Sequence, residues 1–155
     1  MNLASLLDPS LVRVPVESTL KEEMIAELGE LLVRSGRIKD REGMLQALLE
    51  REEKGSTGIG GGIAIPHART DEIEGIVLAM GVSPEGVEFD AVDDEPVHLV
   101  FLLMGSTARP DLNVEALADI GQLVQVPGVY EKLVAASSAQ ELIRIIEEAQ
   151  QNANE

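Results

Sequence analysis

The stretch Val97-His98-Leu99-Val100-Phe101-Leu102-Leu103-Met104 is apolar at every position except His98. A strand with one face in water alternates apolar and polar residues, whereas a strand covered on both faces is apolar throughout. We therefore predict a central β-strand over 97–104, in a sheet that carries helices on both faces.

Shorter strands are predicted on the N-terminal side of this run. Residues 76–82 are apolar and predict a second buried strand, and 11–16 predict a short strand near a sheet edge because a proline interrupts it. Pro-Glu-Gly at 84–86 is typical of a turn, which a short strand at 87–89 would follow.

Helices are predicted where apolar residues recur at a spacing of three or four. These segments start at Thr19, Asp40, Asp111, Val129 and Ser138. Thr19 and Ser138 each begin a Ser/Thr-x-x-Glu capping box, and Gly36 is expected to end the first helix.

This order of elements predicts an α/β fold. Three layers, α/β/α, with a central mixed β-sheet flanked by helices, would bury the apolar pattern. The length suits a single domain over residues 1–150, followed by a polar, frayed tail over 151–155.

The composition restricts the classes of function. Of 155 residues, 45% are hydrophobic and 2% aromatic, so the core is aliphatic and no aromatic platform for stacking bases exists. The absence of cysteine excludes disulfides, thiolate metal sites and thiol nucleophiles. A formal net charge of −16 repels nucleic acid and anionic lipid and suits a basic protein partner, although solubility alone would also account for it. Without an apolar stretch of about 20 residues or a signal-peptide pattern, we expect a cytoplasmic protein.

Residues 55–68, Gly-Ser-Thr-Gly-Ile-Gly-Gly-Gly-Ile-Ala-Ile-Pro-His-Ala, form a glycine-rich segment that leads to His67. Backbone amides in glycine-rich loops can point together and hold an anion. The predicted donors of such a phosphate cradle are Ser56, Thr57, Gly58, Gly60, Gly61 and Gly62. Neither a Walker phosphate loop nor a dinucleotide fingerprint fits the spacing. A flexible surface turn before a strand remains the alternative.

His67 is the candidate nucleophile. A neutral imidazole can accept a phosphoryl group, and Pro66 restricts the backbone beside it. Arg51 and Arg69 are the candidate cations that would neutralise the phosphoryl oxygens. A packed or surface histidine is the alternative reading for His67, and for His98 we expect a strand-end residue at the surface or bonded to the backbone.

Arg51 to Ala68, Arg-Glu-Glu-Lys-Gly-Ser-Thr-Gly-Ile-Gly-Gly-Gly-Ile-Ala-Ile-Pro-His-Ala, resembles a known active-site signature. It is that of the fructose/mannitol-type enzyme IIA domains of the bacterial phosphoenolpyruvate:sugar phosphotransferase system, a family that includes the nitrogen-regulatory enzyme IIA proteins. The resemblance covers nearly the whole chain, with counterparts at Leu6-Leu7, 97–101, Leu117-Ala118 and 138–142.

The resemblance implies the same three-layer fold and a phosphocarrier function. His67 would accept the phosphoryl group, and Arg51 would help to hold it. The donor would be an HPr-type histidine phosphocarrier protein. The recipient would be an enzyme IIB (EIIB) domain, or a transporter or kinase that the phosphorylation state regulates. Neither a metal nor an organic cofactor is implied.

Asn113 departs from the family pattern. Members usually carry a second active-site histidine in a His-Leu-x-x-Leu-Ala motif, and the matching stretch here is Asn113-Val-Glu-Ala-Leu-Ala118. An amide can donate a hydrogen bond to a phosphoryl oxygen but cannot become a cation. This departure favours slow, regulatory phosphotransfer, or a protein-interaction module with weak or no transfer.

Overall fold

The computed structural model describes residues 1–153 and contains one mixed sheet. Its strands are β1 (Val12–Arg13), β2 (Gly58–Gly60), β3 (Ile63–Ala64), β4 (His67–Thr70), β5 (Ile76–Val87) and β6 (Val97–Ser106). The α-helices are α1 (Lys21–Arg34), α2 (Arg41–Glu53), α3 (Pro110–Gln125), α4 (Val129–Val134) and α5 (Ala139–Ala153). Two short 3₁₀-helices, Leu3–Leu6 and Pro9–Leu11, precede β1.

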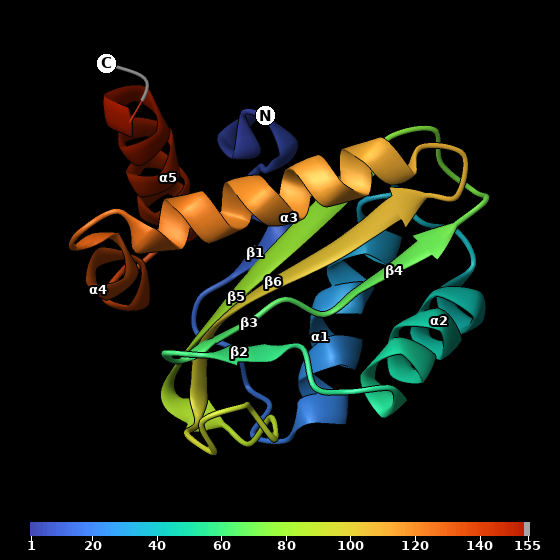
Figure 1. The fold of residues 1–155 in the computed structure, drawn as a ribbon, viewed down its shortest axis with the longest axis horizontal. Coiled ribbons are helices and arrows are strands. Elements are labelled where there is room, and N and C mark those ends of the chain that lie inside the picture. Colours follow the sequence, from blue (N-terminus) through green and yellow to red (C-terminus); the bar gives the residue numbers. More distant parts are fainter. Residues whose placement is uncertain (154–155) are drawn as a thin grey trace.

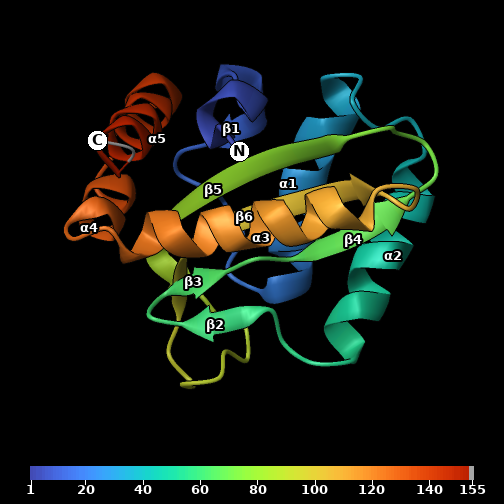
Figure 2. The same ribbon diagram turned by 45° about the horizontal axis from the view of Figure 1, so that its top comes forward.

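The helices lie on both faces of the sheet, so the predicted three-layer α/β/α fold is confirmed. Helices α1 and α2 cover one face and α3 crosses the other (Figure 1). With the top of the molecule turned forward, α3 is seen to run along β6 (Figure 2). Helix α5 packs against α4 and the first 3₁₀-helix, beside the sheet. No helix within residues 1–153 has both the length and the apolar character needed to cross a membrane.

Strand β6 organises the sheet, as its apolar run predicts. It pairs antiparallel with β5 on one side, and parallel with both β3 and β4 on the other. Every residue of β6 is buried except His98, which is half-buried and donates from Nδ1 to the Ser83 carbonyl at 2.8 Å. The sheet order is β1-β5-β6-β3-β2, with β4 paired to β6 beyond β3.

Three local predictions differ from the structure. Residues 84–86 are a bulged part of β5 rather than a turn, because pairing with β6 resumes at Val87 opposite Val97. The N-cap of α1 is Leu20 and has no side-chain cap, because Thr19 and Leu20 are held extended beside Glu88. Helix α5 continues through Ala153, into the segment expected to fray, and 154–155 lie outside the described residues.

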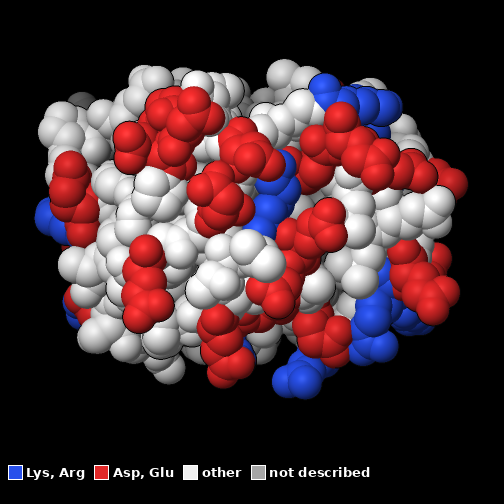
Figure 3. Space-filling view, turned by 90° about the horizontal axis from the view of Figure 1, so that it is seen from below, with Lys and Arg blue, Asp and Glu red and all other residues white. Residues whose placement is uncertain are grey.

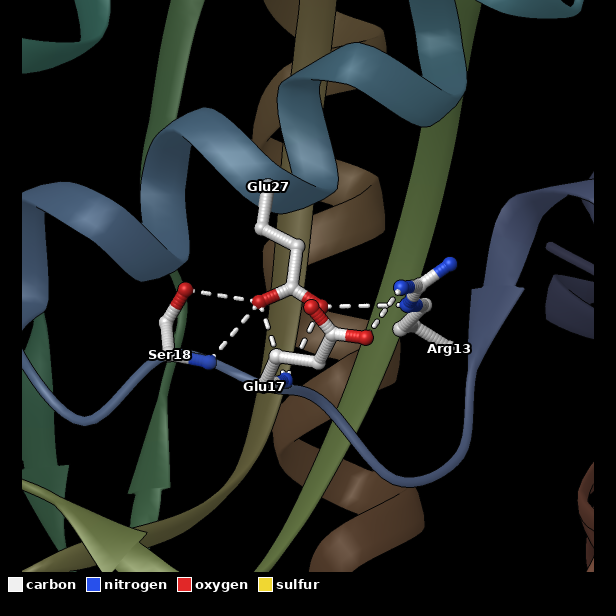
Figure 4. Close-up of polar contacts among 4 residues, drawn as sticks. All are labelled: Arg13, Glu17, Ser18 and Glu27. Carbon is white, nitrogen blue, oxygen red and sulfur yellow. Dashed lines mark hydrogen bonds and ion pairs between the residues drawn. The ribbon is translucent and has the colours of Figure 1, made fainter.

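A partly buried carboxylate on α1 holds the connection between β1 and α1. The Glu27 carboxylate accepts hydrogen bonds from the amides of Glu17 and Ser18 and, at 2.6 Å, from the Ser18 hydroxyl. The Arg13 guanidinium donates to the same carboxylate at 3.1 Å (Figure 4). Burial alone would raise the pKa of Glu27, but these hydrogen bonds and the Arg13 charge outweigh it, so the pKa lies below its ordinary value of 4.5.

We expect Glu27→Gln to lower the free energy of unfolding at pH 7 by about 1–3 kcal/mol, because charge-assisted hydrogen bonds are lost. A lowered native pKa stabilises the fold above the unfolded-state pKa and loses that contribution as the pH falls through the native value. The difference between wild type and variant should therefore shrink below pH 4.5. Denaturant unfolding from pH 7 to below pH 4.5 measures this difference in unfolding free energy, and Glu147→Gln, at an exposed position, is the control. A difference that does not change with pH would contradict this prediction.

Candidate functional site

His67 is the first residue of β4, and the pairing of β3 and β4 along one edge of β6 fixes its position. The Ile65 amide donates to the Thr57 carbonyl at 3.0 Å, and the Pro66 carbonyl accepts from the Leu103 amide at 2.9 Å. His67 itself pairs with Leu103 in the parallel register. The backbone is therefore held immediately before and at the histidine, and Pro66 lies in the short gap between the two strands, where its missing N–H breaks no ladder bond.

The His67 ring is half-buried, and within residues 1–153 only one of its nitrogens makes a hydrogen bond. Its Nδ1 lies 2.7 Å from the Ile65 carbonyl oxygen. A carbonyl oxygen can only accept, so Nδ1 carries the proton and the neutral ring keeps its lone pair on Nε2. This hydrogen bond fixes the orientation of the ring and makes Nε2 the nitrogen that could act as a nucleophile.

His67 opens into a hollow between β4 and α2, with a volume of about 440 Å³. We call it the His67 hollow; its lining residues are Ala47, Glu50, Arg51, Lys54, His67, Ala68 and Arg69. The structure therefore brings the predicted nucleophile together with both predicted arginines. His67 is not sealed in the core, and the hollow is large enough for a phosphoryl group.

The three basic side chains of the hollow differ from most others in this acidic chain. Acidic side chains cover much of the face drawn in Figure 3, and basic side chains appear there in a few separate patches. Within residues 1–153, Arg51, Lys54 and Arg69 take part in no ion pair. The basic side chains that do are Arg13, Lys21, Arg34, Arg37, Arg41 and Arg109. Unpaired cations gathered beside an imidazole create a local positive potential that attracts anions.

Glu52, next to Arg51, does not line the His67 hollow, and its carboxylate connects α2 to the rest of the fold. Its buried carboxylate lies 3.3 Å from the Lys21 ammonium on α1 and accepts from the Thr57 amide at 3.2 Å. The Thr57 hydroxyl also donates to Glu52. Thr57, a predicted cradle donor, is therefore already bonded within the protein.

The remaining cradle candidates are not brought to His67. None of them lines the His67 hollow in the described part of the chain. Gly60 ends β2, and Gly61 and Gly62 form the β2–β3 hairpin turn, with φ of 93°, 66° and 82° at the three residues. The Gly61 amide donates to Asp93 at 3.0 Å. The three glycines supply positive φ for a tight turn rather than amides for an anion.

Ser56 and Gly58 also make hydrogen bonds within the protein. The Ser56 hydroxyl donates to the Phe89 carbonyl at 2.8 Å and accepts from the Gly58 amide at 3.0 Å. A Cβ at Gly58 would collide with Ala91 and at Gly62 with Tyr130, so close packing also requires glycine at these two positions. The geometry therefore gives the cradle prediction no support.

Asn113 is buried on α3, and its amide nitrogen lies 3.4 Å from the Ser106 carbonyl oxygen. It covers Gly105, where a Cβ would collide with the Asn113 side chain. Because Gly105 pairs with Arg69, the register places His67, Arg69 and Asn113 on the same side of the sheet. Asn113 does not line the His67 hollow as the side chains are placed.

Lys54 is a site residue that the sequence analysis did not single out. It lies three positions after Arg51, at the end of α2, and residues three apart occupy one helix face. Helical spacing over residues 41–54 would have predicted that Lys54 lies on the same face as Arg51.

Known proteins share much of this sequence. The family described as "Phosphoenolpyruvate-dependent sugar phosphotransferase system, EIIA 2" matches residues 5–149. The "PTS system fructose-specific EIIA component" of Haloferax volcanii is 35% identical over 95% of this chain and 96% of its own length. The "PTS system fructose-specific EIIABC component" of Bacillus subtilis is 35% identical over 94% of this chain, which spans 23% of that protein.

Solved structures show the same fold. The nitrogen regulatory protein IIA-Ntr from Neisseria meningitidis superposes with a TM-score of 0.85 at 30% identity, over 93% of this chain and 98% of that one. The Escherichia coli enzyme IIAMTL, solved in complex with phosphorylated enzyme IIBMTL, gives a TM-score of 0.78 at 25% identity, over 92% and 97% of the two chains. With sequence, fold and family match in agreement over nearly its whole length, this chain belongs to the EIIA type 2 family of the phosphoenolpyruvate-dependent sugar phosphotransferase system.

Proposed function

We propose that this protein is a phosphocarrier that accepts a phosphoryl group on Nε2 of His67 and passes it to a protein partner. The hydrogen bond from Nδ1 to the Ile65 carbonyl carries this proposal, because it leaves Nε2 unprotonated beside a hollow lined by unpaired cations. Phosphoryl transfer depends on positioning and charge neutralisation more than on covalent assistance, and the hollow supplies both.

The proposed step is an in-line displacement. The Nε2 lone pair attacks the phosphorus of a phosphohistidine on the donor, the new P–N bond forms, and the P–N bond to the donor imidazole breaks. The proton on His67 Nδ1 stays in place, and the Ile65 carbonyl stabilises the partial positive charge of the phosphorylated ring. The Arg51 guanidinium, anchored by its 2.8 Å bond from Nη1 to the Gly55 carbonyl, has further N–H groups to donate to phosphoryl oxygens.

We propose an HPr-type phosphocarrier as donor and an EIIB domain as acceptor, both in the cytoplasm. The E. coli complex of enzyme IIAMTL with phosphorylated enzyme IIBMTL supports an EIIB acceptor by similarity. The net charge of −16 favours partners with basic docking surfaces.

A regulatory role is the second candidate, and Asn113 favours it. The Asn113 amide is buried against Ser106 and cannot become cationic, so the His67 side of the sheet receives no protonatable group from α3 at this position. The similarity to IIA-Ntr agrees with such a role. A partner that binds the unphosphorylated and the phosphorylated protein equally would contradict it.

We expect His67→Gln to abolish phosphorylation by phosphoenolpyruvate, enzyme I and HPr, because the only proposed nucleophile is removed. His98→Gln is the matched control, since its Nδ1 also lies against a backbone carbonyl but its ring is outside the His67 hollow. Acid-labile ³²P incorporation measures the result. Label that persists in His67→Gln would remove His67 from this role.

We expect Arg51→Ala to slow phosphoryl transfer by about 10²-fold, because a charged donor to the phosphoryl oxygens is lost. Arg109→Ala removes the same charge from an exposed pair with Asp111 and should leave the rate unchanged. Rapid-quench assays measure the transfer rate, and denaturant unfolding of the same variants measures any loss of stability. If Arg51→Ala lost stability in proportion to its rate, the side chain would be structural.

We expect Asn113→His to accelerate transfer several-fold at pH 6 and less at pH 8, because a protonated imidazole would add a cation on the His67 side of the sheet. The comparison is the ratio of transfer rates, variant to wild type, at each pH, in samples whose thermal unfolding shows an intact fold. A ratio that does not vary with pH would show that position 113 does not reach the transferred group.

A further inference from the structure

Within residues 1–153, the Lys54 ammonium group has no ion-pair partner, although a suitable carboxylate lies on the same helix. Glu50 lies four residues earlier on α2, the spacing and order that best support a helical ion pair. Helix α1 uses this spacing and order: Arg34 pairs with Glu30 at 3.5 Å. Glu50 instead accepts a hydrogen bond from Gln46 at 3.1 Å.

Three like charges gather at the His67 hollow, and among its lining residues Glu50 is the one carboxylate. Arg51 and Lys54 are like charges three residues apart on one helix face, and Arg69 adds a third from β4. Cations at a helix C-terminus stabilise the helix, which accounts for the first two residues. It does not account for Arg69, which belongs to a strand. A bound dianion would relieve the repulsion among all three.

We propose that Lys54 completes a three-cation oxyanion site in the His67 hollow, together with Arg51 and Arg69. This site holds the phosphoryl group on His67 and, in the unmodified protein, binds free inorganic phosphate. The first half rests on the proposed function, whereas the second depends only on the charges that line the hollow. Lys54 is in this sense a binding residue, added to the pair of arginines that the sequence indicates.

The first test titrates inorganic phosphate into the unmodified protein and follows the His67 ring and Lys54 amide signals by NMR. We expect saturable shifts, and we expect Lys54→Gln to weaken the affinity by about 3- to 10-fold, as loss of one partly screened charge near a dianion predicts. Lys132→Gln is the matched control, because it removes one charge from an exposed, unpaired lysine outside the His67 hollow. Equal effects of the two substitutions, or no saturable shift in the wild type, would overturn the proposal.

The second test measures phosphoryl transfer to His67 from phosphorylated HPr. Lys54→Gln should slow the transfer several-fold, and Lys54→Arg should restore the wild-type rate. The difference in rate between wild type and Lys54→Gln should narrow at high ionic strength, because salt screens the exposed ammonium. Unchanged transfer in Lys54→Gln would overturn the first half of the proposal while the proposed function stands. Lys54-dependent phosphate binding in a protein that never accepts the phosphoryl group would instead overturn the proposed function and leave the oxyanion site intact.

Discussion

The buried carboxylate of Glu52 determines how the site is assembled. It contacts Lys21 on α1 and Thr57 at the start of β2, so one charged group joins two helices to the sheet. A buried carboxylate is tolerated only when it is paired and hydrogen-bonded, which leaves Glu52 one orientation. Consecutive helical residues point about 100° apart, so turning Glu52 inward turns Arg51 toward the His67 hollow. Within the signature, Glu52 and Thr57 therefore hold the elements together, whereas Arg51 and His67 line the hollow.

Charge acts at two ranges in this molecule. The net charge of −16 repels anions at long range, yet the proposed cargo is a dianion. At physiological ionic strength the field of exposed charges decays over about 8 Å, so the cations that line the hollow determine the potential that a phosphoryl group meets there. The acidic exterior and the basic hollow therefore suit two different parts of a partner: its basic docking surface and the phosphoryl group that it carries.

Features with local causes were predictable from the sequence. The apolar run at 97–104 predicted the central strand, Asp40 predicted the start of α2, where its side chain caps Gly43, and the signature predicted that Arg51 and His67 meet. Features that depend on distant partners were not. The hairpin glycines have roles set by Asp93 and Tyr130, far away in sequence. The capping box at Thr19 was displaced by pairing with Glu88, and no pattern in α3 alone could show that Asn113 lies over Gly105.

Strands β3 and β4 share one edge of β6, and Pro66 directly precedes His67, the first residue of β4. The imidazole thus belongs to a paired strand rather than to a loop, and its hydrogen bond to Ile65 orients the ring before any partner binds. A nucleophile that is preorganised in this way adds little reorganisation energy to either half-reaction. Donor and acceptor would meet the same rigid platform, so the direction of exchange would follow the relative phosphorylation potentials of the two partners, with no conformational switch in this chain required.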